Sequence, residues 1–349
     1  MQKFSGTRIE AISACVPKTT VKTTDFSHLL NQKDMRKFEK TTGIRERRHA
    51  QSMVTAADLA FYAAQDVLKE IKDKRDIKGL VFVSQTADYK IPFTSNILQH
   101  RLGLHNNLFC LDINAGCAGF VQGLSCAYSL AQSTNGKIML IIAETLSKIL
   151  SNKDKTTATL FGDGAAALLI SNNPDDCSLS HFDFFSDGGN FDSIIIPDGG
   201  YRNPYSSESL KWHSDNNGNL NQGIHLSMDG QKVFDFTLRE IPKSILSILT
   251  DTQNTTNTID YFLMHQSNKF ILNQIGRALE LPKEKIPINI DRFGNTSGVS
   301  IPLIIVTELK DKIQEDKKIV LTGYGSGLNW GNCILTLKPD LCINDLIEI

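Results

Sequence analysis

Apolar residues along the chain follow two alternating patterns. Short continuous apolar runs are typical of strands that are buried on both faces of a sheet. Between these runs, apolar residues recur every three or four positions, as on the buried face of a helix. The runs predict strands over 78–84, 108–113, 136–144, 165–170, 259–264, 318–322 and 333–337. The periodic segments predict helices over 56–71, 96–102, 117–130, 233–248, 268–279 and 304–312. This alternation indicates an α/β fold with helices on both faces of the sheet.

The pattern is interrupted in the middle of the chain. Residues 186–223 are rich in Gly, Asn, Ser, Asp and Pro, and they include the polar run 216–219. A loop this long is usually a functional cover or a flexible connection. We therefore predict a first α/β lobe over 1–180, a long loop insertion over 181–223 and a second α/β lobe over 224–349. Both lobes follow the order strand, polar loop and buried helix, without any repeat in the sequence itself.

Charge and cysteine content narrow the class of protein. The 37 Lys and Arg residues balance the 38 Asp and Glu residues, which argues against bulk electrostatic binding to nucleic acid or to a membrane. No apolar run approaches the roughly 18 residues of a membrane helix. Residues 1–8 lack the apolar core of a signal peptide, so we expect a cytoplasmic protein. The seven scattered cysteines form no CxxC pair, which disfavours a disulfide framework and a structural metal site.

Cys117 stands between a predicted strand and a predicted helix. Residues 111–120 read Leu-Asp-Ile-Asn-Ala-Gly-Cys-Ala-Gly-Phe, so small residues flank the thiol at the expected helix N-terminus. The positive end of a helix dipole can lower the pKa of a thiol and favour the nucleophilic thiolate. We therefore expect acyl-thioester chemistry at Cys117. The alternative is a packing role, which is common for a cysteine among Ala and Gly.

His265 and Asn295 occupy similar places in the second half of the chain. His265 directly follows the apolar run 259–264, and Asn295 lies in a loop of small residues before another apolar run. Active-site residues commonly lie on loops at the carboxyl ends of strands. Taken singly, His265 also fits a core histidine and Asn295 a turn residue. The glycine-rich turn 323–331 would let the backbone approach a ligand and aim an N–H group at a developing oxyanion.

Seven short motifs, spread over most of the chain, carry a family resemblance. They are Thr-Gly-Ile-Arg-Glu-Arg-Arg at 42–48, Ala-Gly-Cys-Ala-Gly-Phe at 115–120, Phe-Gly-Asp-Gly-Ala-Ala at 161–166, Met-Asp-Gly-Gln-Lys-Val-Phe at 228–234, His-Gln-Ser-Asn at 265–268, Gly-Asn-Thr-Ser at 294–297 and Gly-Tyr-Gly-Ser-Gly-Leu at 323–328. In this order they resemble the β-ketoacyl-ACP synthase III family of the thiolase superfamily. No single motif would be sufficient.

The resemblance implies a fold, a reaction and roles for individual residues. It implies two similar α/β lobes in a five-layered α-β-α-β-α thiolase-like fold, and a homodimer. Cys117 would accept an acyl group, while His265 and Asn295 would assist decarboxylation of a malonyl extender. The backbone N–H groups of Cys117 and Ser326 would form the oxyanion hole. The reaction would be a decarboxylative Claisen condensation to a 3-ketoacyl product, with acyl thioesters as substrates and no permanently bound cofactor.

Positions expected to lie around the substrate match the family pattern at some sites and differ from it at others. The resemblance implies that Gly230 and Asn268 lie near the pantetheine arm of the thioester. Lys37 and Thr41 replace the Trp and Arg that housekeeping members carry beside coenzyme A, which favours delivery by an acyl carrier protein. Lys269 and Arg277 are the candidates for carrier docking, although both also fit solvated surface charges. These departures suggest a specialised member from a secondary-metabolite, unusual-lipid or surface-polysaccharide pathway.

Three other functions compete with condensation. Relatives of the same fold transfer the acyl group to oxygen or nitrogen instead of carbon. The order Cys, His, Asn is also that of papain-like proteases, but the chain has no Cys-Gly-x-Cys-Trp segment. A non-enzymatic subunit of the same fold is the third alternative, and the presence of all three catalytic residue types argues against it.

Overall fold

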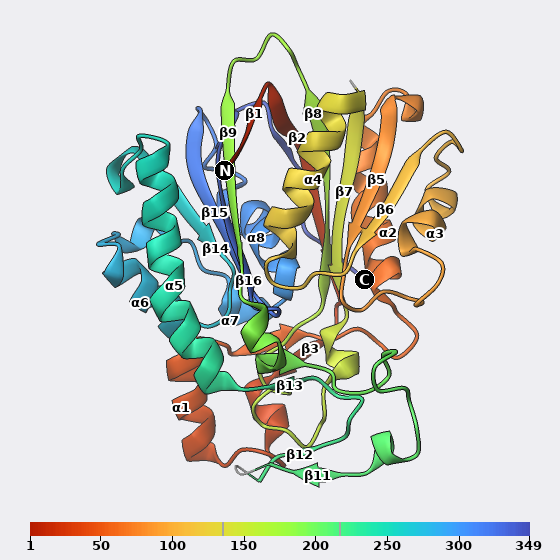
Figure 1. Cartoon of the computed structure of the whole chain (residues 1–349), viewed down its shortest axis with the longest axis vertical. Coiled ribbons are helices and arrows are strands. Elements are labelled where there is room, and N and C mark those ends of the chain that lie inside the picture. The colour runs from red at the N-terminus through yellow and green to blue at the C-terminus, as the bar shows by residue number, and fades with distance from the viewer. Residues whose placement is uncertain (135, 216–217) are drawn as a thin grey trace.

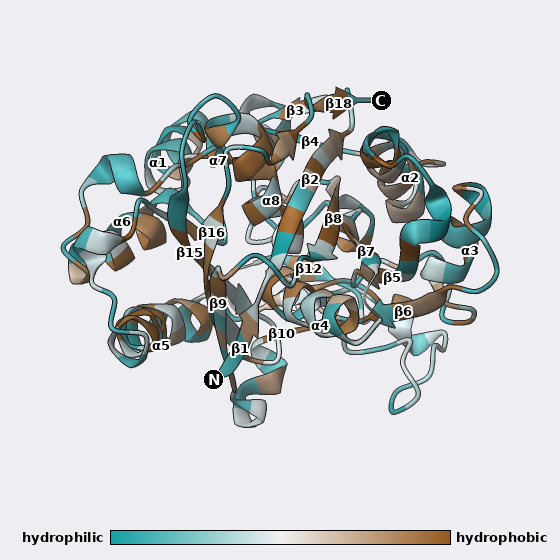
Figure 2. Cartoon of the chain, turned by 90° about the horizontal axis from the view of Figure 1, so that it is seen from above, coloured by the Kyte–Doolittle hydropathy of each residue, from teal (hydrophilic) through white to brown (hydrophobic). Residues whose placement is uncertain are grey.

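The computed structural model describes residues 1–134, 136–215 and 218–349. The predicted polar run 216–219 therefore lies partly outside the described residues. Two β-sheets stand side by side with helices between them and on both outer faces (Figure 1). Viewed from above, the layers follow one another as helices, sheet, helices, sheet and helices (Figure 2). The predicted five-layered α/β fold is confirmed.

The larger sheet has the strand order β17-β2-β8-β7-β5-β6, with β18 also paired to β2. Its strands are β2 (Thr7–Val16), β5 (Ile77–Val83), β6 (Phe109–Ile113), β7 (Lys137–Glu144), β8 (Gly164–Asn172), β17 (Cys342–Ile343) and β18 (Ile347–Glu348). Strands β6 and β7 run parallel to β5, whereas β8 is antiparallel to both β7 and β2. β6 forms one edge of this sheet.

The second sheet has the strand order β1-β9-β16-β15-β14. Its strands are β1 (Gln2–Ser5), β9 (Leu179–Ser186), β14 (Tyr261–Met264), β15 (Lys317–Gly325) and β16 (Asn329–Leu337). β14 is parallel to β15, and the remaining pairs are antiparallel. Three two-stranded ribbons complete the strands, β3 (Thr20–Lys22) with β4 (Glu46–Arg48), β10 (Ile194–Ile195) with β13 (Ser227–Met228), and β11 (His213–Ser214) with β12 (Leu220–Asn221).

Helices cover every sheet face. The middle layer holds α4 (Gly119–Thr134) and α8 (Ser300–Ile304), whose apolar side chains pack with residues of both sheets in one core. The larger sheet is covered on its outer face by α2 (Ala56–Val67) and α3 (Thr94–Arg101). The second sheet is covered by α5 (Gly230–Asp251) and α6 (Lys269–Ala278). The remaining α-helices of the described residues are α1 (Gln32–Thr42) and α7 (Ile290–Phe293).

The sheets do not follow the predicted boundaries of the lobes. β1 and β9 complete the sheet built by the second lobe, while β17 and β18 join the sheet built by the first. The predicted loop insertion 181–223 also starts too early, because β9 runs to Ser186. Phe182 in this strand is fully buried, and the alternating Phe182 and Phe184 are a strand pattern that the polar neighbours obscured. In the described parts of the chain, no helix is both long enough and apolar enough to cross a bilayer.

Candidate active site

Cys117 lies in the short loop between β6 and the N-terminus of α4. Phe120 of α4 is fully buried, which holds this end of the helix between the two sheets. Gly325 at the end of β15 approaches the cysteine closely, since a Cβ atom added there would lie 3.2 Å from the Cys117 Sγ atom. The first glycines of the predicted glycine-rich turn therefore lie against the cysteine, while the predicted approach to a ligand stays a prediction.

His265 and Asn295 come from the second half of the chain. His265 directly follows β14 and is 2% exposed, because α8 and the loop before it pack over the imidazole. Asn295 follows α7 in a loop that pairs with the segment around Phe161. The Asn295 N–H donates to the Leu160 carbonyl at 2.9 Å, and the Gly162 N–H donates to the Asn295 carbonyl at 2.9 Å. Two segments far apart in the sequence are thereby held together.

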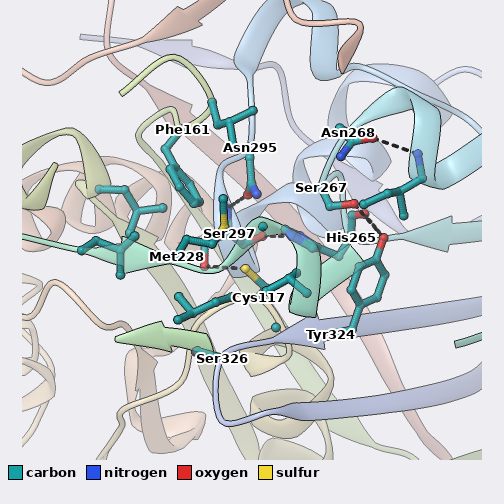
Figure 3. Close-up of a pocket in the computed structure, with 18 of the residues that line it drawn as sticks. Cys117, Phe161, Met228, His265, Ser267, Asn268, Asn295, Ser297, Tyr324 and Ser326 are labelled. Carbon is teal, nitrogen blue, oxygen red and sulfur yellow. Dashed lines mark hydrogen bonds between the residues drawn. The ribbon is translucent and has the colours of Figure 1, made fainter. Parts of the chain in front are cut away.

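The three predicted catalytic side chains line one cavity of about 270 Å³ (Figure 3). Much of its wall is apolar, with Leu146, Leu160, Phe161, Ile194, Leu226, Met228, Val233, Phe234 and Ile271. Polar side chains also line it, among them Gln85, Ser267, Asn268, Ser297 and Ser326. A mostly apolar pocket with a few convergent polar groups is typical of a small-molecule site. Ser326, predicted for the oxyanion hole, also lines the cavity, as do the predicted substrate residues Gly230 and Asn268.

Ser297 contacts all three catalytic candidates. Its hydroxyl donates to the Cys117 Sγ atom at 3.5 Å, and its N–H donates to the Asn295 Oδ1 atom at 2.8 Å. Its carbonyl oxygen lies 3.2 Å from the His265 Nδ1 atom. The φ angle of Ser297 is 53°, a left-handed conformation that non-glycine residues seldom adopt outside constrained sites. Ser297 had no predicted role, although its place two residues after Asn295 is a signal.

Burial controls the ionisation of His265 and Cys117, the two titratable side chains among the catalytic candidates. It lowers the pKa of His265 to about 3, so the imidazole is neutral at physiological pH. Burial also raises the pKa of Cys117 to about 11, while the Ser297 hydrogen bond acts in the opposite direction. The expectation of a lowered cysteine pKa at the helix N-terminus is therefore wrong for the resting protein. Removal from water destabilises the thiolate more than the hydrogen bonds to the sulfur stabilise it.

Gln85 and Glu144 form a second polar group near Cys117 that no sequence pattern predicted. The Gln85 Nε2 atom donates to the Ser326 Oγ atom at 3.1 Å, and its backbone N–H donates to Glu144 at 3.0 Å. Glu144 is fully buried, which raises its pKa to about 7. Gly116 lets the Gln85 amide lie against the backbone, since a Cβ atom there would clash with Gln85. These contacts link the loop after β5 to the loop that carries Ser326.

Tyr324 and Ser267 support His265 from the opposite side. The Tyr324 ring packs edge-on against the imidazole, with the ring centroids 5.2 Å apart and an angle of 78° between the planes. Its hydroxyl donates to the His265 carbonyl at 3.2 Å and lies 2.9 Å from the Ser267 Oγ atom (Figure 3). Ser267 and Tyr324 therefore restrict the orientation of the histidine.

The two predicted docking residues lie outside the cavity lining. Lys269 and Arg277 are both exposed on α6, near its first and last turns. The aliphatic part of Lys269 packs against Gly43 after α1. Asn268 is the N-cap of the same helix, because its side chain accepts a hydrogen bond from the Ile271 N–H at 2.8 Å.

Comparison with known proteins assigns a family. A model of "3-Oxoacyl-[acyl-carrier-protein (ACP)] synthase III" matches residues 111–188, and a model of the C-terminal part of that enzyme matches residues 249–337. The β-ketoacyl-[acyl-carrier-protein] synthase III of Streptococcus mutans is 34% identical over 95% of this chain and 99% of its own. The corresponding protein of Fusobacterium nucleatum is 32% identical over 94% and 97%.

Solved structures agree with this assignment. A 3-oxoacyl-(acyl-carrier protein) synthase from Burkholderia xenovorans has a TM-score of 0.92 and 33% identity, over 100% of this chain and 98% of its own. The synthase III of Pseudomonas aeruginosa has a TM-score of 0.82 and 27% identity, over 95% and 98%. The chain therefore belongs to the 3-oxoacyl-[acyl-carrier-protein] synthase III family of acyltransferases.

Proposed function

We propose that this protein forms a 3-ketoacyl thioester by decarboxylative Claisen condensation of a Cys117-bound acyl group with a malonyl thioester. The observation that carries this proposal is the convergence of Cys117, His265 and Asn295 in one cavity, with Ser297 in contact with each. The family relationship supports the same reaction.

In the first half-reaction, Cys117 takes the acyl group. The sulfur attacks the thioester carbonyl, a new C–S bond forms, and the thiol of the donor leaves with the proton that Cys117 loses. Because the resting thiol has a raised pKa, proton removal accompanies the attack. The backbone N–H groups of Cys117 and Ser326 are our candidates for stabilising the tetrahedral oxyanion, since Gly325, the residue before Ser326, lies against the cysteine.

In the second half-reaction, a malonyl thioester loses CO₂. The electron pair left behind forms an enolate, whose oxygen needs hydrogen-bond donors. The Asn295 Oδ1 atom already accepts the Ser297 N–H, so the Asn295 amide NH₂ is the group left to donate. His265 supplies the second donor as a neutral imidazole. The enolate carbon then attacks the acyl carbonyl, and Cys117 leaves as a thiolate that is reprotonated.

Substitution of the nucleophile tests this function. We expect Cys117→Ala to gain no mass with any acyl-CoA or acyl-carrier donor and to form no 3-ketoacyl product. Cys177→Ala, which removes an exposed cysteine outside the cavity, is the matched control and should load as the wild type does. CO₂ release from a malonyl thioester separates condensation from acyl transfer to oxygen or nitrogen. Undiminished product formation by Cys117→Ala would refute the proposal.

We also propose an acyl carrier protein as a partner, with acyl thioesters as substrates and no permanently bound cofactor. Lys269 is exposed directly after cavity-lining Asn268, Arg277 is exposed in the last turn of the same helix, and exposed Lys37 lies on α1, which contacts α6. Such charges suit an acidic carrier surface. Gly230 and Asn268 are our candidates for contact with the pantetheine arm, because both line the cavity.

A homodimer in the cytoplasm is the setting that we propose. β6 is an edge strand of the larger sheet. Phe109 in this strand is 50% exposed, and the other residues of the strand are only half-buried. Unpaired strand edges with exposed apolar side chains are usually covered by a partner. Pairing with β6 of a second copy, related by a twofold axis, would cover this edge.

All seven cysteines are free, which suits the reducing compartment that we propose.

A further inference from the structure

Gln85 contacts both loops that carry the candidate oxyanion donors. Its side chain lines the cavity, and its Nε2 atom donates to the Ser326 Oγ atom at 3.1 Å. The oxygen of the same amide lies against Gly116, where an added Cβ atom would be 2.2 Å from the Gln85 Oε1 atom. Gly116 directly precedes Cys117. One amide group therefore lies between the residue before Cys117 and the side chain of Ser326.

The turn that carries Ser326 is anchored at its far end by the backbone. The Leu328 N–H donates to the Asp187 carbonyl at 3.0 Å, and the Leu328 carbonyl accepts the Asp187 N–H at 2.8 Å. At the near end, the Asn329 Nδ2 atom donates to the Ser326 carbonyl at 3.1 Å, from within the hairpin of β15 and β16. In the described parts of the chain, Gln85 supplies the hydrogen bond that holds Ser326 from outside this hairpin.

Gln85 is itself held firmly in place. Its backbone N–H donates to the Glu144 Oε1 atom at 3.0 Å, and the adjacent Thr86 hydroxyl donates to the Glu144 Oε2 atom at 2.6 Å. Glu144 is the last residue of β7 and is fully buried, so these bonds fix the loop to the larger sheet. A serine hydroxyl both donates and accepts, so Gln85 can bond to Ser326 with either orientation of its amide.

We propose that Gln85 is a positioning residue that aims the Ser326 N–H at the acyl oxyanion. The inference rests on the proposed function, which assigns this N–H and that of Cys117 to the oxyanion hole. It adds the side chain that fixes the two donors relative to each other. Cys117 follows a strand of the larger sheet and Ser326 follows a strand of the second, so their separation depends on contacts between the sheets.

The Ser326 N–H is available for this role. Among the described residues, no backbone carbonyl accepts a hydrogen bond from it. A donor that is already held in place needs no rearrangement when negative charge develops on the substrate oxygen. Gln85 provides this preorganisation through the Ser326 hydroxyl and leaves the N–H free for the substrate.

An oxyanion forms only when Cys117 attacks a carbonyl group. During loading, the new C–S bond forms as the carbonyl oxygen becomes negative. The carbonyl is restored when the donor thiol leaves with the proton that Cys117 loses. Alkylation of the same thiol by iodoacetamide displaces iodide and forms no oxyanion. A residue that positions an oxyanion donor therefore affects loading and not alkylation, whereas a general loss of packing affects both.

Gln85→Met tests the role with little change of shape, because methionine has a similar length and no amide. Loss of a neutral hydrogen bond corresponds to about a 2–10-fold change, and misplacing a reacting group by about 1 Å can cost about 10²-fold. We therefore expect acyl loading on Cys117 to fall by about tenfold or more, while alkylation stays near the wild-type rate.

Ser326→Ala completes a double-mutant cycle. It removes the hydroxyl that Gln85 holds and keeps the backbone N–H, so its loading should fall as much as that of Gln85→Met. Two substitutions that remove the same contact have effects that do not add. We therefore expect the variant with both changes to load no more slowly than either single variant.

The experiment measures both reactions of Cys117 on each preparation. Intact-mass spectrometry follows loading from the acetyl, butyryl and octanoyl thioesters of coenzyme A and of an acyl carrier protein. Peptide mass spectrometry follows alkylation by iodoacetamide. Gln314→Met changes an exposed glutamine outside the cavity lining, and it should load and alkylate as the wild type does.

Each outcome has one meaning. Slower loading in both single variants, normal alkylation and no further loss in the double variant support the inference. Normal loading in either single variant, an equal fall in alkylation, or losses that multiply in the double variant overturn it. A wild type that loads acyl groups but forms no 3-ketoacyl product refutes the proposed condensation, while the loading rates still decide the role of Gln85. A wild type that accepts no acyl group from any of these donors refutes both.

Discussion

At the scale of single residues, the Cys117 thiol has three neighbours that control its reactivity. The cavity wall removes it from water and Glu144 lies close enough to disfavour a negative charge, whereas the Ser297 hydroxyl donates to Sγ. The first two effects raise the pKa and the third lowers it. With a pKa of about 11, the thiol is protonated throughout the physiological range, and its thiolate fraction rises tenfold per pH unit below that value.

Ser297→Ala tests this balance. The substitution removes the hydrogen bond that stabilises the thiolate, so we expect the pKa of Cys117 to rise further. A hydrogen bond to a charged group contributes about 1.5–3 kcal/mol, which corresponds to at least a tenfold slower alkylation of Cys117 by iodoacetamide at pH 8–9. Peptide mass spectrometry measures this rate, and exposed Cys177 in the same chain is the internal reference. An alkylation rate that levels off near neutral pH, in the wild type or the variant, would contradict the account.

At the scale of elements, α6 connects the stability of the fold to the substrate cavity. Its N-cap Asn268 uses Oδ1 to accept the Ile271 N–H, which leaves the amide NH₂ available in the cavity. Ile271, Leu272 and Ile275 bury the inner face of the helix against the second sheet. The same side chain therefore caps the helix and presents a donor to the substrate arm.

Two substitutions at Asn268 separate these roles. Loss of the cap in Asn268→Ala should lower the free energy of unfolding by about 1 kcal/mol and raise KM for the thioester. Asn268→Asp keeps the capping oxygen but loses the NH₂ donor, so its stability should stay near wild type while KM rises. Chemical denaturation and steady-state kinetics measure the two effects. A normal KM in both variants would exclude Asn268 from substrate binding.

At the scale of the whole molecule, the middle layer makes the two sheets one body. α4 and α8 pack against both sheets, and strands from each end of the chain cross over to the opposite sheet. This arrangement leaves β6 as an exposed edge, and Asp112 within it accepts hydrogen bonds from the Thr94 and Ser95 N–H groups in the first turn of α3. The edge is thus held firmly in place, as a surface for pairing must be.

A charge on this edge should break the proposed dimer. We expect Phe109→Lys to have the mass of one 38.7 kDa chain by light scattering, and the wild type to have twice that mass. The lysine would be buried without a partner in a paired edge, which is unfavourable. Phe270→Lys changes another exposed aromatic residue, on α6 of the other sheet, and should remain dimeric. A wild-type monomer, or a dimeric Phe109→Lys variant, would rule out pairing through β6.

Local patterns were sufficient for much of the fold and for the candidates themselves. The buried strands 136–144 and 318–322 and the helices after Cys117 and Asn268 follow from apolar periodicity, which adjacent residues alone determine. Cys117, His265 and Asn295 stood out because each follows an apolar run or begins a helix. β9 was missed because a charged residue separates its aromatic positions, and its place in the opposite sheet depends on pairing with β16.

The sequence by itself determined the order of strands and helices and the residue types available for catalysis, because both depend on short segments. Only the tertiary structure decided how those residues ionise and which groups face them. Ser297 and Cys117 are 180 positions apart, so no local pattern shows their hydrogen bond. The raised pKa of Cys117 and the lowered pKa of His265 come from desolvation, and desolvation exists only after both halves of the chain have closed around the cavity.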